Sequence, residues 1–242
     1  RLPVSRIHLK LKFSYSKFGC VNMYILLDLS MNDLKNKFIE FTLNHEILRF
    51  GNFTLKSGRK SPYFFNSGLC SSGILLNKLA DCYARYIVDN ISDFDYIFGP
   101  AYKGITLSAS ISMILESKYG INKSFLFNRK ESKDHGELGL FVGGKPNGKA
   151  LVVDDVISSG SSIINSLQLI NESKSTSKNV LVAFDRMEVG SKDRASIELS
   201  KKFDIDIHSI ITLDDIFNYV SANKKYEMHM EDMRNYMDLY KR

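Results

Sequence analysis

Apolar residues along the chain recur at two spacings, one typical of helices and the other of strands. The helical spacing predicts helices at residues 32–50, 73–90, 104–116 and 162–171. Gly51 is expected to cap the C-terminus of the first of these helices. Short apolar runs predict strands at residues 96–98, 124–127, 150–153, 180–184 and 205–212. Strand, turn and strand are expected at residues 53–68, and two charged amphipathic helices at residues 214–242. Because helices separate most strands, the pattern predicts an α/β fold whose central, mainly parallel sheet is flanked by helices.

Composition and charge fit a single domain that does not need a nucleic-acid partner. The 242 residues are 44% hydrophobic and 25% charged, enough to bury a core without disulfides. The net charge is +6, but residues 1–30 contain five Lys or Arg and one acidic residue, so residues 31–242 carry only +2. The basic charge is therefore concentrated at the start of the chain, and the rest offers no strongly basic surface for nucleic acid.

The first thirty residues differ from the rest of the chain. They lack a clear period and are basic and poor in acids, which suits a transit segment, translated upstream sequence or a non-native extension. We expect residues 1–30 to be poorly ordered, Met31 to be a plausible native start, and residues 31–242 to form one domain. No apolar run reaches the roughly 18 residues that a membrane span requires.

The three cysteines, Cys20, Cys70 and Cys82, are odd in number and lack CxxC spacing. This pattern indicates neither a disulfide framework nor a zinc site. Free thiols suit a reducing compartment, and we therefore expect a cytoplasmic protein.

Residues 151–162 are the most informative segment. An apolar strand is followed by Asp154 and Asp155, then by a loop of small residues and a helix. Sites in open parallel sheets lie beyond the carboxyl ends of the strands. Gly160 would let the backbone approach a ligand closely, and the helix N-terminus offers N–H groups to an anion. The segment lacks the Walker lysine, so a nucleoside-triphosphatase P-loop is not predicted.

Two adjacent carboxylates suit a sugar rather than a second phosphate. Carboxylates accept hydrogen bonds from a ribose cis-diol and can also lie near hydrated Mg²⁺. A site with acids beside a phosphate-binding loop therefore fits a ligand with a phosphate on one side and sugar hydroxyls on the other. The alternative is an ordinary strand end followed by a serine-rich helix cap.

Residues 151–162 resemble the phosphoribosyl pyrophosphate (PRPP) signature of the type I phosphoribosyltransferases. That family often has threonine and alanine where this chain has Ser158, Ser159 and Ser161, but the hydroxyls at positions 158 and 161 are kept. Further segments resemble the hood, pyrophosphate loop, mobile loop and later strands of bacterial orotate phosphoribosyltransferases: residues 54–68, 98–105, 127–137, 184–186 and 210–213. The resemblance extends from about Met31 to the end of the chain. It implies the type I fold with a small N-terminal hood at about residues 31–70 and a mobile loop at about 129–144.

The resemblance also implies roles for individual residues. Catalytic roles fall on Lys56, Lys103, Lys130, Lys133, Asp154 and Asp155. PRPP contacts fall on these and on Tyr102, Arg129, His135, Val156, Ile157, Ser158, Ser159, Gly160, Ser161 and Ser162. Orotate contacts fall on Phe64, Phe65, Ser158 and Arg186. In the resembled enzymes the mobile loop crosses a two-fold interface, so Arg129, Lys133 and His135 would act on the neighbouring subunit of a homodimer.

The residue types by themselves leave several alternatives open. Residues 129–135 combine three cations and a histidine, which suits a loop that closes over a polyanion but also suits a solvated surface loop. Phe64 and Phe65 could form a flat wall for a pyrimidine or belong to the core. Arg186 could pair with a substrate carboxylate or form an ordinary surface salt bridge. Lys56, Lys103 and Tyr102 carry no signal without the family.

The implied reaction transfers ribose 5-phosphate from PRPP to N1 of orotate, with Mg²⁺ held mainly by pyrophosphate and ribose near Asp154 and Asp155. One alternative is a phosphoribosyltransferase for a purine or for uracil, which would not need residues 56–68 or Arg186. Another is a non-catalytic regulator that senses PRPP and binds nucleic acid. The near-neutral body and the intact loop argue against the regulator.

Overall fold

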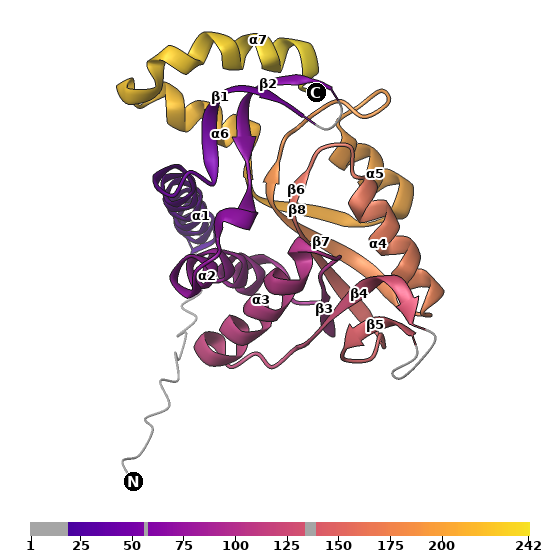
Figure 1. Ribbon diagram of the computed structural model, residues 1–242. Helices are drawn as coiled ribbons and strands as arrows, with labels where there is room; N and C mark the ends of the chain where they lie inside the picture. Colours follow the sequence, from indigo (N-terminus) through magenta and orange to yellow (C-terminus); the bar gives the residue numbers. More distant parts are fainter. Residues whose placement is uncertain (1–18, 56–57, 134–138) are drawn as a thin grey trace.

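A six-stranded sheet forms the centre of the computed structural model, which describes residues 19–55, 58–133 and 139–242 (Figure 1). Its strand order is β5-β4-β3-β6-β7-β8. The strands are β3 (Tyr96–Phe98), β4 (Ser124–Lys133), β5 (Gly139–Gly143), β6 (Lys149–Ile157), β7 (Thr176–Asp185) and β8 (Asp206–Thr212). Neighbouring strands run parallel except β4 and β5, which are antiparallel. The predicted mainly parallel sheet is confirmed.

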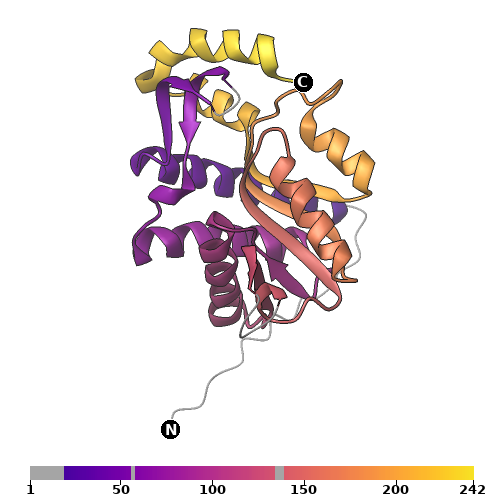
Figure 2. The same cartoon turned by 45° about the vertical axis from the view of Figure 1, so that its right-hand side comes forward.

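Helices cover both faces of this sheet, as the alternating pattern predicted. The helices α1 (Gly19–Asn44), α2 (Gly73–Asn90) and α3 (Lys103–Tyr119) lie on one side, and α4 (Ser161–Glu172) and α5 (Ala195–Phe203) lie on the other (Figures 1 and 2). The bounds of α2 agree with the prediction, because Ser72 accepts a hydrogen bond from the N–H of Leu75 as an N-cap. No helix in the described ranges is long and apolar enough to cross a membrane.

A second, smaller layer forms the predicted hood. The antiparallel pair β1 (Leu48–Thr54) and β2 (Lys60–Phe65) lies beside α6 (Leu213–Ser221), the 3₁₀ helix η2 (Lys224–His229) and α7 (Met230–Tyr240) (Figure 1). A further 3₁₀ helix, η1 (Ser67–Leu69), links β2 to the helices below. Segments from both ends of the chain therefore build this layer, with the C-terminus close to β2 (Figures 1 and 2).

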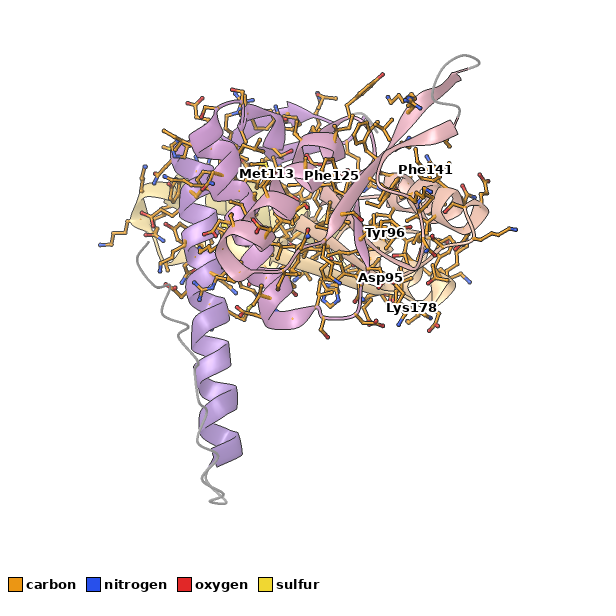
Figure 3. All side chains as sticks on the ribbon, turned by 90° about the horizontal axis from the view of Figure 1, so that it is seen from below. Asp95, Tyr96, Met113, Phe125, Phe141 and Lys178 are labelled. Atoms are coloured by element: carbon orange, nitrogen blue, oxygen red, sulfur yellow. The ribbon has the colours of Figure 1, made fainter. Side chains whose placement is uncertain are left out.

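The first helix differs from the prediction at both ends. It begins at Gly19, before the predicted start at residue 32, and its N-terminal part extends away from the body (Figure 3). Residues 1–18 lie outside the described ranges, and poor order of residues 1–30 stays a prediction. It ends at Asn44, seven residues before the predicted cap. Gly51 instead lies in β1, with a φ of 149° beside a β-bulge. The apolar pattern continued through Ile47 and Leu48 because both are buried in the core, one after a turn and one in a strand.

Two central strands are longer than the sequence indicated. β6 continues to Ile157, so Asp154 and Asp155 lie within the strand and not beyond it, because β7 pairs with it as far as Ile157 and Asp185. β4 likewise continues to Lys133, and the polar, glycine-rich stretch after residue 127 forms a hairpin with β5. Pairing partners stabilise strand conformation in polar segments where apolar patterning gives no signal.

Alternate residues of the central strands enter two separate cores. Leu151 and Val153 pack on the side of α2 and α3, whereas Val152 packs with Ile163 and Leu167 of α4. This arrangement explains why β6 is a continuous apolar run, since a parallel strand covered on both faces needs apolar side chains on both. Packing on both faces also holds the carboxyl end of β6, where Asp154 and Asp155 lie.

Candidate active site

A cavity of about 950 Å³ opens between the hood and the carboxyl ends of β6 and β7. Several of the predicted site residues line it: Phe64, Phe65, Lys103, Asp155, Val156, Ser158, Ser159, Ser161 and Arg186. They come from six different elements or loops, so the fold brings together residues more than 120 positions apart. Its position agrees with the rule that parallel sheets bind ligands beyond the carboxyl ends of their strands.

Asp155 connects three of the elements around this cavity. Its Oδ2 accepts hydrogen bonds from Lys103 Nζ at 2.6 Å and from Ser67 Oγ at 2.7 Å. The aspartate is buried, whereas the lysine side chain is about half exposed. The predicted Lys103 thus lies beside Asp155 of the acidic pair.

Asp154 has a different environment from its neighbour. Its Oδ2 accepts from Ser162 Oγ at 2.7 Å, its Oδ1 accepts from the N–H of Asp155 at 2.9 Å, and its carbonyl oxygen accepts from Tyr83 at 2.7 Å. Burial, and next the charge of Asp155, raise the pKa of Asp154 to about 6. A buried carboxyl with a raised pKa at the edge of a cavity is typical of a functional site.

The loop after β6 forms an anion-binding helix end. Gly160 is the N-cap of α4 with a φ of 76°, and an added Cβ would lie 2.1 Å from Leu199 Cδ1. A larger residue would be strained at this φ and would displace Leu199. The first N–H groups of α4 have no partner within the helix, and Ser159 and Ser161 beside them line the cavity.

The turn between β3 and α3 is equally tight. A Cβ on Gly99 would lie 1.9 Å from the carbonyl oxygen of Gly104, so the two glycines touch backbone to backbone. This contact sharpens the turn and places Lys103 at the first position of α3. The resemblance assigned residues 98–105 to a pyrophosphate loop, but it did not indicate that this turn requires glycine at both positions 99 and 104.

Tyr102 and Lys130 meet at the far side of this turn. Tyr102 is 68% exposed, and Lys130 Nζ lies 4.4 Å from the centre of its ring. The N–H of Ala101 donates to Asn128 Oδ1 at 3.0 Å and links the turn to β4. A second cavity, of about 450 Å³, is lined here by Arg129, Lys130 and Ser162 among others. The predicted cations Arg129 and Lys130 thus line the same cavity as Ser162, the serine that donates to Asp154.

Three of the predicted cationic or titratable residues have no described side chain. Lys56 and His135 lie outside the described residues. The backbone of Lys133 ends β4 and pairs with Gly139. Their assigned roles therefore stay predictions.

The two phenylalanines of the hood have different environments. Phe65 is buried and lies 5.6 Å from the Phe184 ring, so it belongs largely to the core. Phe64 is partly exposed and stacks on Phe53 with ring centres 5.4 Å apart. Of the pair, Phe64 is the better candidate for a wall against a planar base.

Arg186 lines the cavity but is 4% exposed and already has protein partners. Its Nε donates to Glu188 Oε1 at 2.6 Å, and its Nη2 donates to Tyr236 at 2.8 Å and to Ser61 at 3.1 Å. The alternative of a surface salt bridge is wrong, because the pair is buried. The guanidinium is instead held in a fixed orientation at the cavity wall.

The sequence analysis missed four residues that complete the site: Arg59, Ser67, Glu188 and Tyr236. Arg59 and Glu188 line the cavity, and Ser67 binds Asp155. Arg59 and Ser67 lie inside the segment that resembles the hood, so that resemblance could have drawn attention to them. Nothing in the sequence distinguishes Tyr236 from the other residues of the charged amphipathic helix in which it lies.

Comparison with known proteins agrees with this geometry. Residues 74–215 match the profile of the phosphoribosyl transferase domain. The chain is 46% identical over 207 residues to an orotate phosphoribosyltransferase of Haemophilus influenzae (strain PittGG), covering 85% of this chain and 97% of that protein. It is 46% identical over 211 residues to the one of Marinobacter nauticus, covering 87% and 99%.

Structural comparison agrees as well. The crystal structure of orotate phosphoribosyltransferase from Francisella tularensis superimposes with a TM-score of 0.75 at 38% identity, covering 85% of this chain and all of that one. The predicted type I fold is therefore confirmed. By sequence and by structure, the chain belongs to the orotate phosphoribosyltransferase family.

Proposed function

We propose that this protein is a pentosyltransferase that moves ribose 5-phosphate from PRPP to N1 of orotate. The products are orotidine 5′-monophosphate and pyrophosphate, as in de novo synthesis of UMP. The observation that carries the proposal is the acidic pair Asp154–Asp155: Asp155 lines the cavity and binds Lys103, and Asp154 binds Ser162 in the first turn of α4. Family membership identifies the base as orotate.

At the ribose end, Asp154 and Asp155 accept hydrogen bonds from the two ring hydroxyls. The ligand hydroxyls replace Ser162 and Ser67 or share the carboxylates with them, since each serine now donates to one acid. The loop of residues 158–162 binds the 5-phosphate through backbone N–H groups and serine hydroxyls. Binding at these remote groups aligns the reacting carbon.

During the reaction, N1 of orotate gives up its proton to solvent and forms a bond to the anomeric carbon, as the bond from that carbon to pyrophosphate oxygen breaks and pyrophosphate leaves. Positive charge develops on the ribose and negative charge on the leaving group. Asp154 and Asp155 stabilise the first, and Lys56, Lys103, Lys130 and Lys133 stabilise the second. Arg129 and His135 add donors to the same diphosphate.

Mg²⁺ fits this site only with help from the substrate. Asp154 and Asp155 offer hard carboxylate oxygens, but the described residues contain no group of three or more His, Cys, Asp or Glu that could hold a metal. Pyrophosphate and ribose oxygens would supply the remaining ligands. When bound, the ion would neutralise charge on the departing pyrophosphate.

At the base end, Phe64 packs against the pyrimidine face and Arg186 faces its carboxylate. Phe65 supports Phe64 from the core, and Ser158 contacts the base edge. A planar guanidinium held by fixed partners matches a carboxylate without further ordering. A cytoplasmic location stays a prediction.

A spectrophotometric assay tests the reaction directly. Orotate consumption should require both PRPP and Mg²⁺, and an excess of uracil or hypoxanthine should not compete with orotate. Consumption of a purine or of uracil in place of orotate would contradict the base assignment. No affinity for PRPP in the presence of Mg²⁺ would contradict the whole proposal.

The mobile loop gives a sharper test. Lys133→Ala should lower kcat at least tenfold, equivalent to about 1.4 kcal/mol of transition-state stabilisation, because one cation no longer faces the leaving group. Lys145→Ala, in the connection that follows β5, is the control and should retain activity. A Lys133→Ala enzyme with unchanged turnover would contradict the loop assignment.

We further propose a homodimer in which Arg129, Lys133 and His135 act on the partner's site. Mixing the impaired Lys133→Ala and Asp155→Asn proteins should then give more activity than either protein alone, because one site of the mixed dimer is intact. Gel filtration should show a dimer. Absence of rescue, under conditions where subunits exchange, would contradict shared sites.

A further inference from the structure

A buried polar cluster connects the C-terminal helix α7 to the base end of the cavity. The Tyr236 hydroxyl, on α7, donates to Glu188 Oε1 and accepts from Arg186 Nη2 at 2.8 Å. Glu188 Oε1 also accepts from Arg186 Nε at 2.6 Å. Each of these three residues is at most 5% exposed. One triangle of hydrogen bonds therefore fixes the guanidinium.

The other carboxylate oxygen of Glu188 binds a second cation. Its Oε2 pairs with Arg59 Nη1 at 3.0 Å, and the Arg59 guanidinium lies 5.1 Å from the centre of the Tyr240 ring. Arg59 comes from the hood, between β1 and β2, and Arg186 comes from the end of β7. A single carboxylate thus connects two arginines from separate elements, both of which line the cavity.

The end of the chain is anchored to the segment that carries Glu188. The N–H of Val189 donates to the carbonyl of Tyr240 at 2.8 Å, and the N–H of Arg242 donates to the carbonyl of Met187 at 3.0 Å. Glu188 and Lys241 form an antiparallel bridge. Figure 1 shows the C-terminus near the start of β2. Tyr236 is therefore held in place from both its own helix and the strand-like tail.

This cluster has the arrangement of a support for a binding residue. Two of the three guanidinium nitrogens of Arg186 bind protein oxygens, and the Tyr63 ring lies 4.4 Å from the guanidinium carbon, yet the residue still lines the cavity. A surface ion pair would tolerate several rotamers, but a buried, directionally bonded guanidinium has one. If one of these partners is lost, the guanidinium of Arg186 keeps its charge but no longer has a fixed orientation.

We propose that Glu188 and Tyr236 are positioning residues for the pyrimidine: they hold Arg186 and Arg59 toward the base carboxylate, so that α7 sets the affinity for orotate. This inference rests on the proposed orotate activity. It assigns to the C-terminal helix, outside the PRPP-binding elements, a role specific to one of the two substrates. The acidic pair and α4 are connected to other residues, so PRPP binding should not depend on α7.

Tyr236→Phe tests this with the loss of a single oxygen. We expect KM for orotate to rise at least fivefold, while kcat and KM for PRPP stay within twofold of wild type. Tyr219→Phe, a similar change on α6 away from the cluster, is the control and should alter none of the three. Thermal unfolding of both variants measures any loss of stability separately.

Glu188 provides the second variant. Glu188→Gln keeps the shape but removes the charge shared by the two arginines, so KM for orotate should rise at least tenfold. Glu188→Asp keeps the charge and should recover part of the affinity. A purely structural role predicts instead a lower unfolding temperature with both KM values unchanged or raised together.

The outcomes are separable. An inactive wild-type enzyme would contradict the proposed function itself. An active wild type, with unchanged orotate KM in a folded Tyr236→Phe protein, would overturn only the positioning role. If Glu188→Gln fails to fold, Tyr236→Phe still decides the question, since it retains both charges and the ring.

Discussion

The two ends of the cavity are built in different ways. The end proposed to bind the phosphoribosyl group comes largely from one contiguous segment, residues 154–162, with Lys103 added from α3 and Ser67 from η1. The base end is assembled from β2, the segment after β7 and α7, and its central arginine depends on a tyrosine fifty positions away. A contiguous motif can be recognised in a sequence, whereas a dispersed one becomes visible only in the fold.

The two ends also differ in how they hold charge. At the phosphoribosyl end two buried carboxylates lie side by side, and the conflict raises the pKa of Asp154, first through burial and then through Asp155. At the base end the buried cation Arg186 is paired with the buried anion Glu188. The first end holds two acids beside one lysine, Lys103, whereas at the second end Glu188 is shared by two arginines, Arg186 and Arg59, and fixes their orientation.

The largest effect should come from breaking the phosphoribosyl end. Asp155→Asn removes the acceptor that holds both Lys103 and Ser67, so kcat/KM for PRPP should fall about 100-fold, which equals about 2.7 kcal/mol. Asp93→Asn is the control, because Asp93 pairs with Lys149 at the opposite end of β6 from Asp155. Steady-state kinetics measures both. An Asp155→Asn enzyme within threefold of wild type would remove the ribose role.

A smaller effect should follow from filling the phosphate loop. Gly160→Ala forces a side chain into a φ of 76° and to within 2.1 Å of Leu199, so KM for PRPP should rise about tenfold. Gly120→Ala is a matched control, since Gly120 has a φ of 68° but open space around it. Unfolding by urea should show Gly160→Ala to be less stable than Gly120→Ala by about 1–3 kcal/mol, the usual range for overpacking. Equal losses would show that backbone conformation alone matters.

The smallest effect should appear in the pH dependence. As pH falls below about 6, Asp154 takes up a proton and becomes a weaker acceptor, so KM for PRPP should rise a few-fold toward pH 5. KM for orotate should stay flat over the same range, because Arg186 keeps its charge. Asp154→Asn should abolish the inflection near pH 6. An inflection that persists in this variant would assign it to another group.

The same pKa shift has a consequence for stability, and its sign is opposite to the usual one for an acid. A folded-state pKa raised from 3.8 to about 6 favours folding with the proton bound, so this contribution is present below pH 3.8 and is lost as pH rises through 6. Asp154→Asn should therefore stabilise the fold at pH 8, by up to roughly 3 kcal/mol, and little at pH 4. Thermal unfolding at the two pH values measures the difference.

Much of the fold could be predicted from local pattern alone. The bounds of α2 follow from Ser72 and an amphipathic period, and Tyr96–Phe98 follows from a short apolar run. The end of β6 could not be found this way, since the polar residues Asp154 and Asp155 are kept in the strand by pairing with β7. The end of α1 was misplaced because Ile47 and Leu48 are buried in the core after the helix has ended.

The sequence by itself determined the family, the parallel sheet and the acidic pair with its phosphate loop, because these depend on residues that are neighbours along the chain. Only the tertiary structure decided what surrounds them. Ser67 donates a hydrogen bond to Asp155, Lys130 lies over the Tyr102 ring, and Glu188 and Tyr236 both hydrogen-bond to Arg186. Such contacts depend on the direction and burial of side chains from distant elements. A hydrogen bond needs a defined distance and angle, and these exist only once the chain has packed.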